Sequence, residues 1–285
     1  MSAAPAARPA QGAGGGDSGD GERLSKRVAQ MLGCSRREAE QTIEGGWVRV
    51  AGKVVEIPQH RVQAQSVTVD PEASLLSMGE VTLILHKPPK LLDGVQDDHG
   101  PVAAPKGPPA GRARQARVAA PRGARQLLVA ANHSPQDNSG QRPLLRHFKQ
   151  LQASVPLETA ASGLVVFTQD WRVQRKLQED MAQMEHELMV EVHGEVKAEA
   201  ISPIERALRD PRQRLPVTKI SISSASEARS ILRLAVKGAH PGLAAYLCEL
   251  AGLEIQALRR TRLGRVSLGD VAPGQWRYLA EYERF

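Results

Sequence analysis

The clearest candidates for chemistry in this sequence are seven basic side chains within residues 22–55. Cationic side chains near helix N-termini and on a hairpin can donate hydrogen bonds to phosphate oxygens. The pattern therefore predicts binding of a polyanion; the alternative is a small basic unit whose charges are only solvated. The seven side chains are Arg23, Lys26, Arg27, Arg36, Arg37, Arg49 and Lys53.

A second candidate is Glu158, a single carboxylate that stands just before the apolar run 163–168. A carboxylate held beside a buried strand can act as a nucleophile or can transfer protons. The three residues that follow it, Thr-Ala-Ala, are small. They predict a small and apolar pocket next to this carboxylate.

Composition and charge limit the class of protein. The length suggests about two domains. The sequence has 38 Lys and Arg against 31 Asp and Glu, which gives a net charge of +7. This charge favours nucleic acid over a membrane surface as the partner. No apolar run approaches the roughly 20 residues that cross a bilayer, and the N-terminus has no signal-peptide pattern. Cys34 and Cys248 lack metal-ligand spacing. We therefore expect a reduced, cytoplasmic, monomeric protein without a bound metal.

The elements that position the basic residues are expected to begin at Glu22. Ser35, with Glu38 three residues later, forms a capping box that starts a helix. An apolar stripe before it predicts another helix that stops at Gly33. The expected elements are a helix over 24–32, a second helix that ends at Gly45-Gly46, a hairpin over 47–55, and strands near 67–70 and 81–86.

The rest of the chain predicts short strands mixed with helices, without strict βαβ alternation. This pattern is typical of the α+β class: a small N-terminal α/β module, then a larger, mixed and mainly antiparallel sheet domain flanked by helices. We expect helices near 143–152, 171–183, 200–208 and 242–250. We expect strands near 163–168, 187–193, 215–222, 229–236, 254–259 and 264–268.

One long stretch fits neither pattern. From residue 99 to residue 136 the sequence contains no Asp or Glu and is rich in Pro and Gly. Such a stretch indicates a basic insertion, at about 99–142, part of which is a mobile loop. Its basic residues are Lys106, Arg112, Arg114, Arg117, Arg122 and Arg125.

Residues 22–55 closely resemble the S-four-type RNA-binding domain, named after ribosomal protein four of the small subunit. The resemblance rests on E-R-L-S-K-R-V-A at the first helix, S-R-R-E-A-E at the second helix and V-x-V-x-G-K-x-V in the hairpin. It implies binding of structured RNA by shape and phosphate contacts rather than by base reading.

Beyond residue 80 the chain resembles bacterial ribosomal RNA pseudouridine synthases, in the branch with an N-terminal S-four-type domain. Leu157-Glu158, four residues, then G-L-V-V-F-T stand against the family's R-L-D-x-x-x-x-G-L-L-L-L-T. The closing run 258–270 is almost unaltered family sequence, and His86-Lys87-Pro88 resembles the family's N-K-P. We therefore expect a disordered tail over 1–21, an S-four-type domain over 22–79 and a pseudouridine-synthase-like domain over 80–285.

This resemblance implies a reaction that needs no cofactor: a carboxylate acts on a flipped-out uridine in a dry pocket. Glu158 stands at the position of the family's catalytic Asp, Pro156 at that of its Arg and Leu188 at that of its Tyr. The later basic helix is lost, because residues 239–258 contain no Lys or Arg. Within the matching runs, the basic residues expected to contact ribosomal RNA are Lys87, Arg260 and Arg262.

Two hypotheses follow. In the first, the protein binds RNA with little or no isomerase activity. The extra methylene of Glu158 misplaces the carboxylate, which can lower the rate about a hundredfold. Loss of the neighbouring Arg removes a charge-assisted hydrogen bond worth about 1.5–3 kcal/mol. In the second, Glu158 is a working nucleophile on a reshaped loop. Compensating polar groups would then come from His86, His186, Glu187 and His240. A Glu158 carboxylate buried against a basic side chain and facing an open cleft would favour the second hypothesis.

Overall fold

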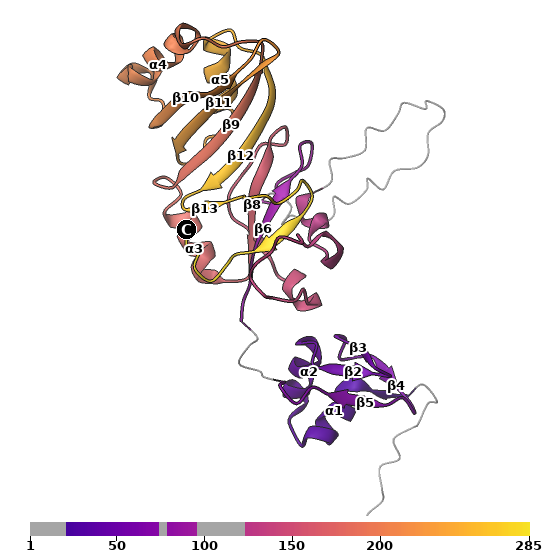
Figure 1. Cartoon of the computed structure of the whole chain (residues 1–285). Coiled ribbons are helices and arrows are strands. Elements are labelled where there is room, and N and C mark those ends of the chain that lie inside the picture. Colours follow the sequence, from indigo (N-terminus) through magenta and orange to yellow (C-terminus); the bar gives the residue numbers. More distant parts are fainter. Residues whose placement is uncertain (1–20, 74–78, 96–122) are drawn as a thin grey trace, which may run out of the picture. The chain divides into compact units, whose positions relative to one another are not determined.

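The computed structural model describes residues 21–73, 79–95 and 123–285 (Figure 1). The chain divides into two compact units, Met1–Met78 and Gly79–Phe285. The predicted N-terminal tail and most of the predicted basic insertion lie outside the described residues. No helix in the described ranges is both long and apolar enough to span a membrane.

The first unit begins with two helices that lie against short strands. Ser35 accepts a hydrogen bond from the Glu38 backbone N–H at 3.3 Å, and the Glu38 carboxylate accepts one from the Ser35 N–H at 2.8 Å, which confirms the capping box. Gly33 ends the first helix with a φ of 62°, a left-handed value that glycine adopts freely. The elements are β1 (Glu22–Arg23), α1 (Leu24–Leu32), α2 (Arg36–Glu44), β2 (Val48–Val50), β3 (Lys53–Val54), β4 (Arg61–Val62) and β5 (Val67–Val69).

The second unit is built on one large sheet with the strand order β10-β11-β9-β12-β8-β6-β14. All of its pairings are antiparallel except the one between β8 and β12. The strands are β6 (Thr82–Lys87), β7 (Gln152–Ala153), β8 (Ser162–Thr168), β9 (Glu185–His193), β10 (Thr218–Ala225), β11 (Arg229–Lys237), β12 (Ile255–Leu263), β13 (Val266–Ser267) and β14 (Trp276–Tyr278). The predicted α+β class is confirmed.

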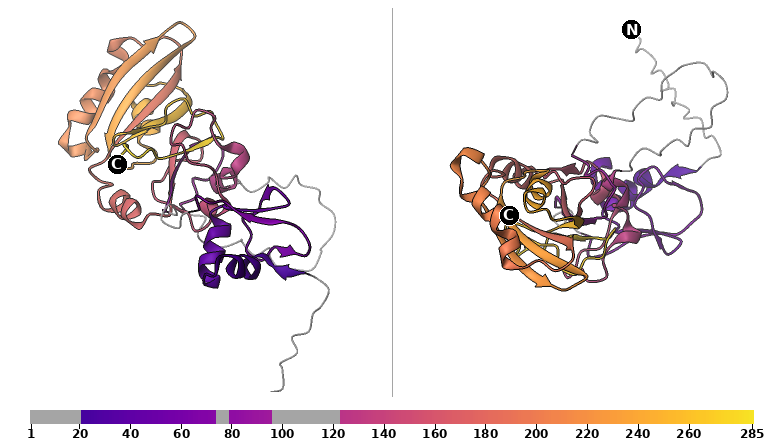
Figure 2. Two further views of the ribbon diagram at one scale, coloured as in Figure 1. Left: turned by 60° about the horizontal axis from the view of Figure 1, so that its bottom comes forward. Right: turned by 90° about the horizontal axis from the view of Figure 1, so that it is seen from above.

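Three α-helices and several 3-10 turns flank this sheet. The helices α4 and α5 pack into one apolar cluster with β9, β11 and β12, whereas α3 packs into a second cluster with β6 and β8 (Figures 1 and 2). The helices are α3 (Trp171–Glu179), α4 (Ser202–Arg209) and α5 (Leu243–Leu250); the 3-10 turns are η2 (Ala124–Leu127), η3 (Ala130–Asn132), η4 (Leu145–Phe148), η5 (Ala198–Ile201) and η6 (Pro211–Gln213).

Some of the predicted elements are wrong. The helix expected over 143–152 is the short turn η4 followed by the strand β7. The strands expected over 254–259 and 264–268 are one long strand, β12, which turns back at Gly264 into β13. No strand was expected at β14, although its buried, half-buried, buried pattern is that of a strand.

Aromatic contacts explain why η4 is not a longer helix. The ring of Phe148 lies edge-on to Trp276 with the centroids 5.4 Å apart, and His147 Nδ1 lies 2.7 Å from the Tyr278 hydroxyl. Trp276 Nε1 donates to the Val129 carbonyl at 2.8 Å. These contacts fix 129–148 against β14, so tertiary packing decides the local structure there.

The described residues on either side of 96–122 meet on the sheet domain. Leu92 and Gly123 form a parallel bridge, and the Ala124 N–H donates to the Leu92 carbonyl at 2.8 Å. Residues 96–122 therefore leave and rejoin the described fold at neighbouring points.

The backbones of β8 and β12 approach each other closely at their parallel contact. Only Ser162 with Arg259 and Gly163 with Arg260 are in register there. Gly163 has a φ of 112°, and a Cβ at this position would lie 2.2 Å from the Arg260 carbonyl oxygen. Glycine is required at this contact, because any side chain would force the two strands apart.

We predict that Gly163→Ala lowers the free energy of unfolding by about 3 kcal/mol or more, since backbone strain and a backbone clash act together. Urea unfolding of the variant and the parent measures the difference. Gly79→Ala is the matched control, because an added Cβ at Gly79 meets no atom within 4 Å. Equal stabilities of Gly163→Ala and Gly79→Ala would contradict the clash.

Burial of His147 predicts a pH dependence of stability. Burial, and then the nearby Arg146, lower the pKa of His147 from 6.5 to about 4. The unfolded chain therefore takes up a proton before the folded one does, so this stabilisation is present above pH 6.5 and is lost as the pH falls towards 4. His147→Gln cannot titrate, and its unfolding free energy should fall less between pH 7 and pH 4.5 than that of the parent. Identical pH profiles from thermal unfolding would refute the assignment; His193→Gln, at an exposed histidine, controls for the change of residue type.

Candidate functional site

Glu158 lies on a loop that precedes β8, and its side chain is tied to α5. Its Oε1 accepts a hydrogen bond from the Gly242 backbone N–H at 2.7 Å. Gly242 is the N-cap residue of α5, with a φ of 87°, and has no side chain that could cap the helix. The carboxylate of Glu158 therefore lies at the positive end of the helix dipole, where a negative charge is stabilising.

Lys87, at the end of β6, holds this loop from inside the protein. Its side chain is fully buried, and its Nζ donates to the carbonyls of Ala161 at 2.7 Å, Leu91 at 2.9 Å, Pro88 at 3.2 Å and Thr159 at 3.3 Å. Burial lowers the pKa of Lys87 to about 8, and the opposite charges of Asp93 and Glu158 limit the drop. Lys87 thus orders the loop that carries Glu158.

Arg260, on β12, holds the other end of the same loop. Its guanidinium donates to the carbonyls of Leu164 at 2.8 Å, Pro156 at 2.9 Å and Val155 at 3.3 Å. It is 1% exposed, and this burial lowers its pKa to about 10.

The prediction that Lys87 and Arg260 contact RNA is therefore wrong. Both side chains lie in the interior, and their donors are taken by backbone carbonyls. Arg262 differs, because it is partly exposed and forms ion pairs with Glu185 at 2.6 Å and Glu187 at 3.5 Å. Its contact with RNA stays a prediction.

A small cavity of about 30 Å³ lies beside Glu158. A space of this size takes about one water molecule. Leu188 lines it, as the altered motif suggests, and Arg260 is the only lysine or arginine among the described residues that line it. The lining also includes Leu157, His186, Val236, His240, Leu243 and Leu258.

Among the described residues that line this cavity, His186 is the one with a buried side-chain nitrogen that has no hydrogen-bond partner. It is 3% exposed, and its Nε2 has no hydrogen-bond partner among the described residues. Burial, and then the charges of Arg260 and His240, lower its pKa to about 3, so the ring is neutral at pH 7. His240 lies at the cavity too, and its Nε2 donates to the Lys237 carbonyl at 3.0 Å.

The other two residues expected to compensate for the altered motif are elsewhere. His86 is buried and its Nδ1 donates to the Val271 carbonyl at 2.6 Å. Glu187 forms ion pairs with Arg233 and Arg262. Neither lines the cavity, so of the four candidates the fold brings only His186 and His240 to Glu158.

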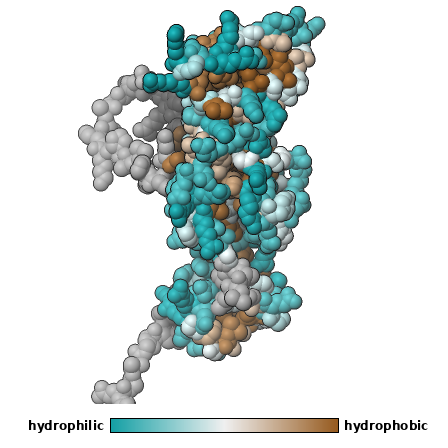
Figure 3. All heavy atoms as spheres, turned by 90° about the vertical axis from the view of Figure 1, so that its left-hand side faces the viewer, coloured by the Kyte–Doolittle hydropathy of each residue, from teal (hydrophilic) through white to brown (hydrophobic). Residues whose placement is uncertain are grey.

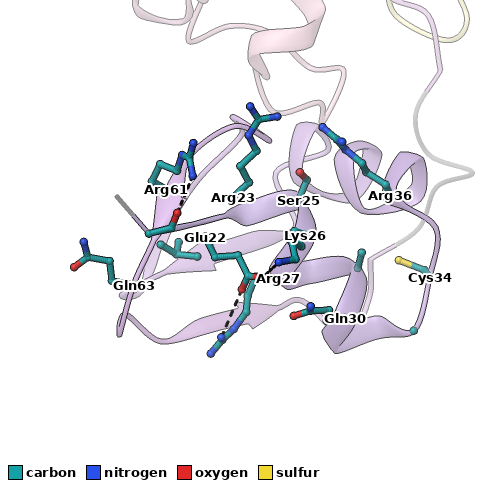
Figure 4. A pocket seen from close by; sticks show the side chains of 14 residues that line it. Glu22, Arg23, Ser25, Lys26, Arg27, Gln30, Cys34, Arg36, Arg61 and Gln63 are labelled. Carbon is teal, nitrogen blue, oxygen red and sulfur yellow. Dashed lines mark hydrogen bonds and ion pairs between the residues drawn. The ribbon is translucent and has the colours of Figure 1, made fainter. Parts of the chain in front are cut away.

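Five basic residues of the first unit, Arg23, Lys26, Arg27, Arg36 and Arg61, line a hollow of about 850 Å³ (Figure 4). Arg23, Arg36 and Arg61 extend to one side of the module in this view, whereas Arg27 extends to the other. Glu22 lies 3.2 Å from Lys26 Nζ and 3.8 Å from Arg27 Nη1. Arg36 also forms an ion pair, with Glu40 at 2.9 Å, so these three cations are partly neutralised. No ion pair is described for Arg23, which is therefore the best placed of the four to meet an anion.

The sequence analysis missed Arg61 and placed three residues in this cluster that do not line the hollow. Arg61 belongs to β4, outside the matched motif, and its Nη1 donates to the Gly21 carbonyl at 2.8 Å. Only a basic residue next to a short strand marks it in the sequence. The exposed Arg37, Arg49 and Lys53 lie away from the hollow, and their role stays a prediction.

The described residues contain no group of three or more His, Cys, Asp and Glu side chains that could hold a metal ion. The arrangement offers a cationic surface on the first unit and, on the second, a carboxylate beside a small cavity.

Comparison with known proteins shows which proteins this chain is similar to. Residues 22–67 match the model of the S4 domain. An uncharacterized RNA pseudouridine synthase of Aquifex aeolicus is 25% identical over 92% of this chain and 94% of its own length. Ribosomal large subunit pseudouridine synthase B of Bacillus subtilis is 22% identical over 92% and 93%. A crystal structure of a pseudouridylate synthase aligns with 91% of this chain and 96% of its own at a TM-score of 0.49 and 15% identity. Over about 92% of its length this chain is similar to proteins named RNA pseudouridine synthases, and its residues 22–67 match the S4 domain.

Proposed function

We propose that this protein binds structured ribosomal RNA and carries out little or no isomerisation of uridine. The observation that carries the proposal is the contact of Glu158 with the Gly242 N–H, at 2.7 Å, beside a cavity of about 30 Å³. The S4 domain, and relatives named as ribosomal pseudouridine synthases, support RNA as the partner.

The size of the cavity opposes catalysis in this conformation. A flipped-out uridine must enter a pocket next to the carboxylate. The cavity beside Glu158 takes about one water molecule, and a pyrimidine ring is several times larger. The residues that line the cavity would have to move before a base could enter.

The hydrogen bonds of the cations near Glu158 are also unfavourable for catalysis. A nucleophilic carboxylate needs partners that aim it at the reacting carbon. Lys87 and Arg260, both close to the Glu158 loop, donate to backbone carbonyls and, among the described contacts, not to Glu158. The one hydrogen bond described for the carboxylate ties it to α5.

The basic side of the S4 domain supports RNA binding. Arg23, Arg36 and Arg61 extend to the same side and border a hollow of about 850 Å³. Exposed arginines in such an arrangement pair with phosphate oxygens and release counterions, which makes the affinity dependent on salt.

The second candidate function is isomerisation with Glu158 as the nucleophile. One observation favours it: His186 offers a buried nitrogen, without a partner among the described residues, to the same cavity that Glu158 lines. A base admitted by an opening of the turn at His240 would find a polar group there.

The isomerase test uses transcribed ribosomal RNA, treated with carbodiimide after incubation with the protein and read by reverse transcription. We expect no protein-dependent stop with the parent chain. A stop that appears with the parent and disappears with Glu158→Ala would overturn the proposal and establish the second candidate.

The stability of two Glu158 variants tests the structural role in parallel. Glu158→Gln keeps an acceptor oxygen for Gly242, whereas Glu158→Ala removes it. We expect Glu158→Ala to lower the free energy of unfolding by about 1 kcal/mol and Glu158→Gln to lower it by less. Equal effects of the two variants would contradict the hydrogen bond to α5.

The RNA-binding prediction concerns Arg23 and Arg36. Changing either to Gln should weaken binding of ribosomal RNA uniformly across sequences and reduce the slope of log affinity against log salt by about one per residue. Filter binding at several salt concentrations measures both. Arg209→Gln, at an exposed arginine on α4, is the control. Unchanged slopes in the Arg23 and Arg36 variants would exclude this side of the S4 domain as the phosphate contact.

A further inference from the structure

Trp171 stands out among the three tryptophans of the chain by its exposure. It begins α3 and is 56% exposed, whereas Trp276 is fully buried and Trp47 is half-buried. Neither the S4 surface nor the cavity beside Glu158 includes it. The mechanism considered above gives this large aromatic side chain no role.

The position of Trp171 is fixed by the helix that carries it. Asp170 Oδ1 accepts the Arg172 N–H at 2.7 Å, and Thr168 Oγ1 accepts the Asp170 N–H at 3.0 Å. Leu177 is fully buried in the cluster beneath α3. The ring is thus presented from a capped and anchored helix, so little conformational entropy is lost when a ligand covers it.

Cationic groups border the ring. The Arg172 guanidinium carbon lies 5.9 Å from the centroid of the Trp171 ring. Arg175 is exposed one turn further along the same face of the helix. The acids of α3 and its C-cap, Glu179 and Asp180, lie at the far end, where they pair with Arg175 and Lys176. At the end of the helix that carries the ring, Arg172 is the cation that borders it, and the one acid described there, the N-cap Asp170, accepts the Arg172 N–H.

The surroundings of the ring do not have the apolar character of a protein-binding hot spot. Such hot spots lie within a larger apolar patch that excludes water. Trp171 is the only exposed large hydrophobic residue described on α3. On the face drawn in Figure 3, hydrophobic residues gather at the end of the second unit that carries α4 and α5, while hydrophilic ones predominate over its middle.

We propose that Trp171 and Arg172 form a stacking site for an unpaired base of RNA. A single flat ring bordered by arginines matches one base and its phosphate: the ring stacks on the base, and the guanidinium meets the charge. The site rests on the proposed RNA-binding function and adds a contact on the second unit to those of the S4 domain.

The test compares Trp171→Ala with Trp171→Phe in the full chain, with a single-stranded oligoadenylate as the probe. Trp171→Ala should weaken binding about tenfold, and Trp171→Phe should keep most of the affinity because it keeps a ring. The oligonucleotide should quench the tryptophan fluorescence of the parent and quench that of Trp171→Phe far less. Tyr282→Ala, at an aromatic residue that is 85% exposed, is the control and should bind like the parent.

Each outcome bears on one proposal or on both. Parent-like affinity of Trp171→Ala, together with weaker binding of ribosomal RNA by Arg23→Gln, would overturn the stacking site and leave the proposed function standing. Equal losses in Trp171→Ala and Trp171→Phe would overturn stacking. If the parent binds neither ribosomal RNA nor the oligoadenylate, both proposals are overturned.

Discussion

The backbone contact between β8 and β12 is the constraint on which the second unit depends. Two residue pairs in parallel register join one half of the sheet, β10-β11-β9-β12, to the other half, β8-β6-β14. Gly163 makes the contact possible because it has no side chain, and Arg260 stabilises it because its guanidinium binds three carbonyls across the junction. The loop that carries Glu158 leaves from this junction, so its shape is set by the same contact.

Local patterns predicted much of the fold. The capping box at Ser35, the helix that stops at Gly33 and most of the strands depend on neighbouring residues, and these predictions are confirmed. The helix expected over 143–152 failed because the rings of His147 and Phe148 pack on β14, more than a hundred residues later. A pattern within the segment cannot report such a distant partner.

The position of the candidate site in the chain was predictable, but the hydrogen bonds of its side chains were not. Spacing alone placed Glu158 before β8, and its resemblance to a family motif suggested an altered pocket. Lys87 and Arg260 are predicted to contact RNA because they lie in runs that resemble the family, and a lysine or arginine is rarely buried without partners. Here the partners are backbone carbonyls, and no sequence pattern marks a carbonyl as free to accept. For the same reason, the hydrogen bond from Gly242 to Glu158 became visible only in the folded chain.

The bridge between Leu92 and Gly123 has a consequence for how this protein can vary. Because Leu92 and Gly123 lie at adjacent points of the domain, a change in the number of residues between them leaves both anchors in place. When a flexible insert is added, each doubling of its length costs only about 0.6 kcal/mol of closure entropy. The domain can therefore accept long insertions or deletions between these two anchors, including a tag or a whole guest domain, while the sheet beneath keeps its register.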